Sequence, residues 1–278
     1  MSSPKDRLLQ LSGHLNGTDN SEENKPRLCC KVCIITGAGS EKGIGRATAW
    51  SFAKNDLLPQ LAKDIQTKYP KVTVISRKLD AASEDDVKST VDDAIKKFGR
   101  LDVFFANAGI LRTTRIHDLE PSKFMEVMRV NVLSVFLAIK HASTAMKITG
   151  IDKKQSGGSI IAIASVAGLR SGAGPIDYSA SKAAVINMIQ VGACHLTNTN
   201  IRGLVETSMT TLLFDYARTR GTLNKVGQLN PLQRYAVPDE IANVVTFLAS
   251  DESSYINGHS LTVDGGLASS IPVTGKFS

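Results

Sequence analysis

The residues best suited to proton chemistry lie in the stretch 178–182, which reads Tyr-Ser-Ala-Ser-Lys. We expect a helix to begin near Asp177, and because residues four apart on a helix share a face, Tyr178 and Lys182 should point into the same space. An unperturbed phenol has a pKa near ~10, which is too high for an efficient acid or base at neutral pH. A cation held nearby favours the phenolate and lowers that pKa. The pair could therefore exchange a proton at neutral pH.

Ser165 strengthens this interpretation. The run 159–164 (Ser-Ile-Ile-Ala-Ile-Ala) predicts a buried strand of a parallel sheet, and Ser165 follows it directly. Its hydroxyl is then expected at the carboxyl end of a strand, where open α/β sheets bind their ligands. A Tyr and a Lys four residues apart are by themselves more often a surface pair, so the Ser at a strand end is what favours a site.

Length and composition indicate one α/β domain. The chain has 278 residues, of which 42% are hydrophobic, and this suits a single unit with a sizeable core. We see no apolar run near the ~18 residues of a membrane span and no signal peptide, so we expect a soluble, cytoplasmic protein with no membrane partner. The net charge is +7, but basic residues are scattered among acids. We predict a solvated surface and no nucleic-acid partner, with nucleic-acid binding a minor alternative.

The amino-terminal segment 1–28 is rich in Ser, Asn, Gly, Asp, Glu and Lys, and we expect a disordered extension before a domain at 29–278. The sequence has four cysteines. Three of them fall in or beside an apolar run and none has a His at ligand spacing, so we predict buried, reduced thiols and no metal site. They are Cys29, Cys30, Cys33 and Cys194.

A glycine-rich turn joins the first predicted strand, 29–35, to the first predicted helix, 47–54. Such a turn lets backbone N–H groups approach a pyrophosphate at the positive end of the helix. A plain tight turn is the alternative. The residues concerned are Gly37, Gly39, Gly43, Ile44 and Gly45.

The ordered combination of these motifs with three further ones resembles the single-domain short-chain dehydrogenase/reductase family. The further motifs are Asn-Ala-Gly at 107–109 after the predicted strand 103–105, Asn131 in a predicted helix 124–148, and Val-Asp-Gly-Gly at 263–266. The resemblance covers about residues 29–270. It implies an α/β fold with a Rossmann-like, doubly wound parallel sheet, NAD or NADP as hydride carrier, and a homo-oligomer, either a dimer or a tetramer.

The resemblance also implies catalytic roles. Tyr178 would exchange a proton with the carbinol or carbonyl oxygen, and Ser165 would hydrogen-bond that oxygen. Lys182 would lower the pKa of Tyr178 and bind the nicotinamide ribose. Asn131 would hold a water that links Lys182 to solvent, although an Asn inside an apolar helix could also satisfy neighbouring backbone carbonyls.

By the same resemblance, a second set of residues would bind the cofactor. Asp80, which ends the predicted strand 72–79, matches the adenine-binding Asp of the family, with an ordinary turn residue as the alternative. Thr207 matches the residue that contacts the nicotinamide carboxamide. The full set is Gly37, Gly39, Gly43, Ile44, Gly45, Asp80, Asn107, Ala108, Gly109, Tyr178, Lys182 and Thr207.

Two segments of the family pattern are missing. After the first helix the family has a strand whose end reads the ribose 2′ position, but here residues 52–55 run straight into the predicted helix 56–64. After the helix of Tyr178 the family has a strand ending in Pro-Gly, but here 197–202 runs into Gly203. We therefore predict a sheet that lacks the second and sixth family strands. At the second gap, about six extended residues reach roughly 20 Å, so 198–203 could form a makeshift strand. At the first, residues 56–69 must reverse, unwind or pack elsewhere.

The carboxyl-terminal part should carry a helical lid at 210–230, a helix at 238–250 and a last strand at 259–263. Apolar residues in and near the lid predict a neutral substrate with a secondary alcohol or ketone, although core packing is the commoner role for such side chains. They are Leu169, Ile176, Leu204, Met209, Leu212, Leu213 and Phe214.

The predicted function is an oxidoreductase that transfers a hydride between NAD(P) and a small alcohol or carbonyl substrate. The alternative from another class is a catalytically impaired dinucleotide-fold protein that acts as a binding or oligomerisation partner. The two gaps favour that alternative. The intact set of Ser165, Tyr178, Lys182 and Asn131 favours the enzyme.

Overall fold

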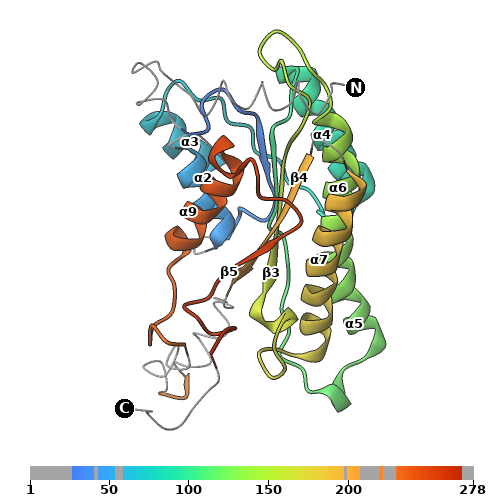
Figure 1. The fold of residues 1–278 in the computed structure, drawn as a ribbon. Coiled ribbons are helices and arrows are strands. Elements are labelled where there is room, and N and C mark those ends of the chain that lie inside the picture. The colour runs from blue at the N-terminus through green and yellow to red at the C-terminus, as the bar shows by residue number, and fades with distance from the viewer. Residues whose placement is uncertain are drawn as a thin grey trace.

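The computed structural model describes residues 27–40, 43–53, 59–196, 199–206, 219–221 and 230–270. Its centre is one parallel sheet whose five strands lie side by side in chain order (Figure 1). The strands are β1 (Cys33–Ile35), β2 (Val103–Ala106), β3 (Gly158–Ser165), β4 (Thr199–Glu206) and β5 (Ser260–Val263).

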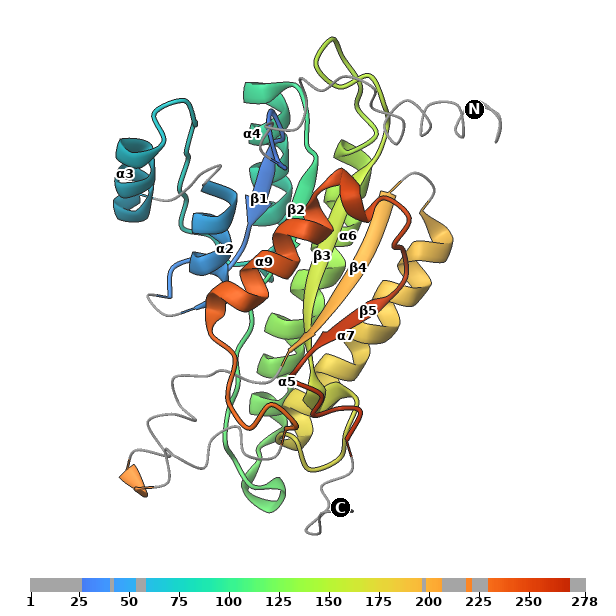
Figure 2. The same ribbon diagram turned by 60° about the vertical axis from the view of Figure 1, so that its left-hand side comes forward.

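Helices cover both faces of the sheet (Figures 1 and 2). On one face α2 (Ile44–Ala53) lies against α9 (Pro238–Ala249), and on the other lie α4 (Glu84–Phe98), α6 (Ser134–Ala145) and α7 (Ile176–His195). This is the Rossmann-like, doubly wound α/β architecture that the sequence predicted.

The strands are apolar on both faces because each face packs into a core. On β3, Ile160 and Ala162 join the core beneath α4, α6 and α7, whereas Ile161 and Ile163 join the core beneath α2 and α9. A strand buried on both sides reads as a continuous apolar run. This is why the run 159–164 was recognisable in the sequence.

The predicted helix 124–148 is interrupted by one wider turn. The helix α5 (Pro121–Met128) passes through a π-helical turn, η2 (Arg129–Leu133), into α6. Such turns are rare and often occur at functional sites. Asn131 lies in this one.

No strand lies between α2 and α3 (Pro59–Lys68) in the described residues, which exclude 54–58. The helix α3 packs elsewhere, as expected: Ile65 is buried beside Ala49 of α2. The predicted strand 72–79 is wrong, because the structure assigns no strand there. In the family pattern, the second strand lies between the first strand and the strand predicted at 72–79. Here β1 is the outermost strand of the described sheet, so residues 72–79 have no second strand with which to pair.

The predicted absence of the sixth strand is also wrong, whereas the makeshift strand considered at 198–203 is confirmed in the described part of that segment. The strand β4 pairs in parallel with β3 from Thr199 opposite Gly158 to Glu206 opposite Ser165, and it pairs with β5 on its other side. The segment was underestimated because it lacks the Pro-Gly ending. Its place between two neighbours and the burial of Ile201 explain why it is a strand.

Other predictions lie partly or wholly outside the described residues. These are the extension 1–28 up to residue 26, most of the lid 210–230, and Thr207. In the part of the chain that is described, no helix is long and apolar enough to cross a membrane, and no group of three or more His, Cys, Asp or Glu side chains could hold a metal ion.

The prediction of buried cysteines is largely wrong. Cys29, Cys30 and Cys194 are exposed, and Cys33 is half-buried. The first two lie in a turn that precedes β1, because the strand begins later than its apolar sequence suggested.

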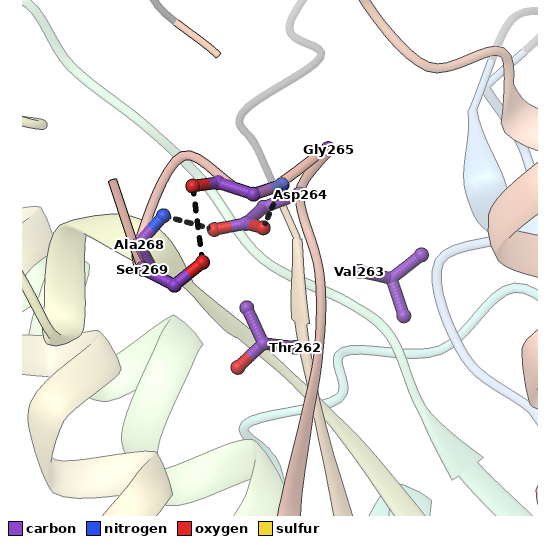
Figure 3. Close-up of a pocket in the computed structure, with 7 residues that line it drawn as sticks. Thr262, Val263, Asp264, Gly265, Ala268 and Ser269 are labelled. Carbon is purple, nitrogen blue, oxygen red and sulfur yellow. Dashed lines mark hydrogen bonds between the residues drawn. The ribbon is translucent and has the colours of Figure 1, made fainter. Parts of the chain in front are cut away.

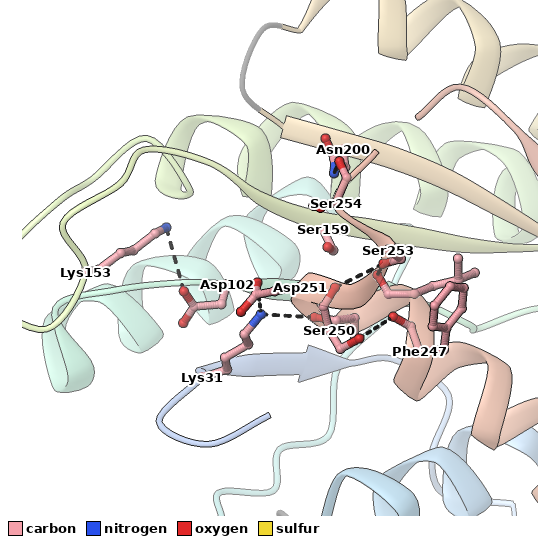
Figure 4. Close-up of polar contacts among 12 residues, drawn as sticks. Lys31, Asp102, Lys153, Ser159, Asn200, Phe247, Ser250, Asp251, Ser253 and Ser254 are labelled. Atoms are coloured by element: carbon pink, nitrogen blue, oxygen red, sulfur yellow. Dashed lines mark hydrogen bonds and ion pairs between the residues drawn. The ribbon is translucent and has the colours of Figure 1, made fainter. Parts of the chain in front are cut away.

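A buried acid closes the amino end of the sheet between β1 and β2. The Asp102 carboxylate accepts the Val32 N–H at 2.8 Å and two N–H groups of Arg100, each at 2.8 Å. Lys153 Nζ lies 4.0 Å from it (Figure 4). The hydrogen bond with Asp102 raises the pKa of Arg100, while burial lowers that of Lys153.

A buried arginine fixes β4 to the end of α9. Only 1% of Arg202 is exposed. Its guanidinium donates to the Ser159 hydroxyl at 2.6 Å and to three backbone carbonyls, those of Leu248, Ser253 and Ile256. Burial lowers the pKa of Arg202 to about 10, so it remains charged at neutral pH. A cation is favourable near the carboxyl end of a helix, where carbonyls are unsatisfied.

We predict that Arg202→Met destabilises the protein by roughly 3 kcal/mol or more, because each buried acceptor left without a donor costs about 1–3 kcal/mol. Urea unfolding measures the free energy. The control is Arg77→Met, since the Arg77 side chain is 38% exposed and pairs with Asp93 at the surface; its change should stay within about 0.5 kcal/mol. Equal losses in the two variants would contradict the role assigned to Arg202.

Candidate active site

The site lies at the carboxyl edge of the sheet. Ser165 is the last residue of β3, and its partner across the ladder, Glu206, is in turn opposite Val263 of β5. Ser165 is fully buried, and its hydroxyl accepts the Ala167 N–H at 3.3 Å. The parallel register therefore aligns the ends of three strands beside Ser165, as expected for an open α/β sheet.

The helix α7 brings Tyr178 and Lys182 together. Tyr178 is 5% exposed and Lys182 is 4% exposed, and Lys182 Nζ lies 5.5 Å from the centre of the Tyr178 ring. The ammonium donates to the carbonyl of Ile163 at 2.8 Å. Since Ile163 is two residues before Ser165 on β3, this hydrogen bond holds the Tyr178 face of α7 against the strand that ends in Ser165.

A glycine permits this close packing. The short helix η3 (Val166–Gly168) follows Ser165 directly. A Cβ on Gly168 would lie 2.7 Å from the Lys182 carbonyl carbon and 2.8 Å from the Ala183 nitrogen. Any side chain at Gly168 would force the segment that follows Ser165 away from α7.

Asn131 connects the loop after β2 with α7. Its Oδ1 accepts the Ile110 N–H at 2.8 Å, and its Nδ2 donates to the Ile110 carbonyl at 2.9 Å and to the Ser181 hydroxyl at 3.0 Å. Asn131 thus binds backbone groups, but those of a neighbouring loop and not of its own helix. A Cβ on Gly109 would lie 3.2 Å from Asn131 Oδ1 and 3.7 Å from Lys182 Nζ, so this loop also reaches Lys182.

Ser181 is a residue that the sequence analysis did not single out. Its hydroxyl is fully buried, donates to the Tyr178 carbonyl at 2.7 Å and accepts from Asn131. Its position three residues after Tyr178, on nearly the same helical face, was a usable signal. We infer that Ser181 positions the helix turn that carries Tyr178.

The loops that follow β1 and β2 are tied together by a threonine. Thr36 Oγ1 accepts the N–H groups of Asn107 and Ala108, both at 3.1 Å, and Asn107 Nδ2 donates to the carbonyls of Thr36 and Gly37 at 2.9 and 3.2 Å. Gly37 has φ +71°, and a Cβ there would lie 2.8 Å from the Ala108 Cα. The Gly37, Asn107 and Ala108 backbones therefore form one rigid corner.

The glycine turn ends at the start of α2, which includes Ile44 and Gly45. A Cβ on Gly45 would lie 2.6 Å from Asn107 Nδ2, so the first turn of α2 packs on the same corner. Around a Cβ at Gly39 there is open space within 4 Å. A backbone that is open at Gly39 and lies close to a helix start is a suitable place for a pyrophosphate, so this part of the turn fits a dinucleotide.

Asp80 lies in the turn that precedes α4, and it pairs with Arg129 in the π-helical turn that holds Asn131. Its carboxylate accepts from Arg129 at 2.8 Å and from the Ala82 N–H at 2.9 Å. These hydrogen bonds, that of Arg129 first, lower the pKa of Asp80. The side chain is 48% exposed, so it remains accessible.

A cavity of about 480 Å³ opens at the carboxyl end of β5 (Figure 3). Its lining includes Asp264, whose buried carboxylate accepts the backbone N–H groups of Gly266 and Ala268. Arg170, which follows η3, donates to the Leu267 and Ala268 carbonyls. The cavity wall is thus joined to the segment that follows Ser165.

The predicted substrate-facing apolar residues divide into three groups. Leu204 is fully buried in the core beneath α9, so its assignment near the substrate is wrong. Leu169 and Ile176 are about half exposed at the edge of the site. The remaining ones, Met209, Leu212, Leu213 and Phe214, lie outside the described residues.

Comparisons with known proteins agree with this arrangement. A family model described as Enoyl-(Acyl carrier protein) reductase matches residues 37–268. The 3-oxoacyl-(acyl-carrier-protein) reductase FabG of Thermotoga maritima is 36% identical over 87% of this chain and 99% of its own length. The L-rhamnose-1-dehydrogenase of Scheffersomyces stipitis is 32% identical over 85% of this chain and 95% of its own.

A solved structure extends the similarity to the fold. The crystal structure of levodione reductase superposes with a TM-score of 0.77 at 27% identity, covering 87% of this chain and 99% of the other. The chain therefore belongs to the short-chain dehydrogenase/reductase family of oxidoreductases.

Proposed function

We propose that this oxidoreductase transfers a hydride between NAD or NADP and a substrate with a secondary alcohol or ketone. The observation that carries the proposal is the burial of Tyr178 and Lys182 side by side, with Lys182 hydrogen-bonded to the strand that ends in Ser165. A phenol beside a cation can exchange a proton at neutral pH. Relatives named as a reductase and a sugar dehydrogenase support the substrate class.

The nicotinamide cofactor, when bound, supplies or accepts the hydride. The backbone at Gly37, Gly39, Gly43, Ile44 and Gly45 would hold the pyrophosphate at the start of α2, with the open side of the turn at Gly39. The corner at Asn107–Gly109 and the Lys182 ammonium would bind the part of the cofactor nearer the nicotinamide. Asp80 would contact the adenine, and Thr207 the carboxamide.

The protein's own residues would handle the proton. In reduction, Tyr178 donates its phenolic proton to the carbonyl oxygen, and in oxidation the phenolate removes the proton of the alcohol. The Ser165 hydroxyl hydrogen-bonds the same oxygen and so orients the substrate. Lys182 stabilises the phenolate by its charge. Asn131, held by Ile110 and Ser181, would keep a water at the Lys182 end of the site through which Tyr178 is reprotonated.

We also propose a homo-oligomer. Large apolar side chains are exposed along the helical segment that runs through α5, η2 and α6, at Met125, Leu133 and Phe136. A cluster of this kind on one helix is suited to a self-complementary interface.

We predict that Tyr178→Phe lowers turnover by roughly 10²–10⁴-fold, the usual contribution of a positioned general acid. Cofactor affinity should be nearly unchanged, because only the proton donor is removed. Oxidation of NADH and NADPH with a panel of small ketones measures turnover, and calorimetric titration measures affinity. The control is Tyr255→Phe, at a side chain that is 99% exposed. Undiminished turnover in Tyr178→Phe would refute the assignment.

A second prediction concerns Lys182→Met. Without the ammonium, formation of the phenolate requires a higher pH, so the pH of half-maximal alcohol oxidation should rise. Cofactor binding should weaken as well, because the same ammonium binds the ribose. Lys154→Met, at an exposed lysine, should change neither quantity. An unshifted pH–rate profile in Lys182→Met would show that Lys182 does not act on Tyr178.

A third prediction concerns the second strand of the family pattern, which the described residues do not place beside β1. In this fold, the end of that strand carries the side chain that distinguishes the ribose 2′-OH of NAD from the 2′-phosphate of NADP. We therefore expect the dissociation constants of NADH and NADPH to differ by less than about tenfold, or roughly 1.4 kcal/mol. Calorimetric titration of the purified chain measures both. A larger preference would mean that another segment supplies the missing contact.

A further inference from the structure

Two adjacent thiols meet in the turn that precedes β1. The N–H of Lys31 donates to the Leu28 carbonyl at 3.2 Å, which closes a β-turn with Cys29 and Cys30 at its centre. Cys29 Sγ and Cys30 Sγ lie 3.3 Å apart, and both residues are exposed. The turn thus presents two sulfurs in contact with each other at the surface.

The backbone of this turn is strained. Cys30 has φ +62°, and in the described part of the chain the one other non-glycine residue with positive φ is Gln233. This turn position usually holds Gly or Asn, because a Cβ is disfavoured there. Strained residues of this kind gather at functional sites and persist where the surroundings hold them.

The surroundings hold this turn from several sides. Leu28 is 3% exposed and packs in the core beneath α2 and α9. Arg27 pairs with Glu252 at 2.7 Å, and Lys31 pairs with Asp251 at 2.6 Å (Figure 4). The next residue, Val32, donates to the buried Asp102 carboxylate. These anchors keep the two thiols in place at the cost of the strain at Cys30.

We propose that Cys29 and Cys30 form a two-electron thiol–disulfide site that reacts with small oxidants of the peroxide class. One thiol reacts with hydrogen peroxide to give a sulfenic acid and water. The second thiol then attacks that sulfur, forming the S–S bond and releasing a second water. Two thiols are oxidised to one disulfide, and one peroxide is reduced to two waters.

The geometry favours a reversible switch over a permanent crosslink. Adjacent Cα atoms across a trans peptide are about 3.8 Å apart, whereas ordinary disulfides span about 4.4–6.8 Å. The ring formed by neighbouring cysteines is therefore strained, and strained disulfides are easily reduced.

Metal binding fits the pair less well. Tetrahedral Zn²⁺ with Zn–S bonds of about 2.3 Å separates two sulfurs by roughly 3.8 Å and requires four ligands. The described residues offer no cluster of three or more candidate ligands. The two thiols lie at the amino ends of the strands, whereas Ser165 lies at the carboxyl ends. The thiol site therefore does not depend on the proposed catalytic function.

The test counts alkylatable thiols in the full chain after treatment with one equivalent of hydrogen peroxide. The reduced chain has four cysteines, so intact mass should show four maleimide additions before oxidation and two after it. Glutathione should restore four. Phenylarsine oxide, which bridges two neighbouring thiols, should bind the reduced chain at one equivalent. Its binding should prevent peroxide from oxidising these two thiols.

Variants identify the pair. Cys29→Ser and Cys30→Ser should abolish the peroxide-dependent loss of two thiols, whereas the matched variants Cys33→Ser and Cys194→Ser should keep it. Cys30→Gly should abolish the loss while melting at the same or a higher temperature, because glycine relieves the strain at φ +62°. An undiminished thiol count, a loss that persists in Cys29→Ser, or a disulfide between two chains would overturn the proposal.

Discussion

The site depends on the parallel pairing of β3 with β4. The two strands stay in register from Gly158 and Thr199 to Ser165 and Glu206, so one ladder decides where the carboxyl edge of the sheet lies. The buried Arg202 fixes this ladder at its other end, since its guanidinium joins β4, β3 and the last turn of α9. Because a shift of one residue along a strand turns every side chain to the opposite face, Ser165 can occupy its position in this register alone.

Everything else in the site is attached to that edge by short polar contacts. Lys182 joins α7 to β3 by its hydrogen bond to the Ile163 carbonyl. Asn131 joins the π-helical turn to α7 by its hydrogen bond to the Ser181 hydroxyl. Thr36 joins the loops that follow β1 and β2. Each contact joins elements that are distant in sequence. Proton chemistry needs such preorganisation, because a misplaced donor loses much of its effect.

The sequence was sufficient to predict those parts of the fold and the site that local residue types and their spacing determine. Tyr178 and Lys182 meet because they lie four positions apart on a helix, and the short apolar run before Ser165 correctly predicted a buried strand. Prediction from sequence failed where the neighbouring strands of the sheet determine whether a segment forms a strand. The strand β4 forms because β3 and β5 stand on either side of it, whereas residues 72–79, with a similar apolar pattern, lack a strand beside them. The same limit applies to Cys29 and Cys30: the apolar run beside them indicated burial, but a turn held by Leu28 and two ion pairs exposes them.

In the proposed reaction, a hydride passes between a nicotinamide and a carbonyl carbon at the carboxyl ends of the strands. The most direct measurement is isotope transfer from NADH or NADPH that carries deuterium at the transferring position, incubated with the chain and small prochiral ketones and followed by mass spectrometry and NMR of the alcohol. Direct hydride transfer predicts one deuterium, bound to the carbinol carbon, in the product of the wild-type chain. Alcohol without deuterium at that carbon, or no alcohol from any ketone while the cofactor is bound, would contradict it.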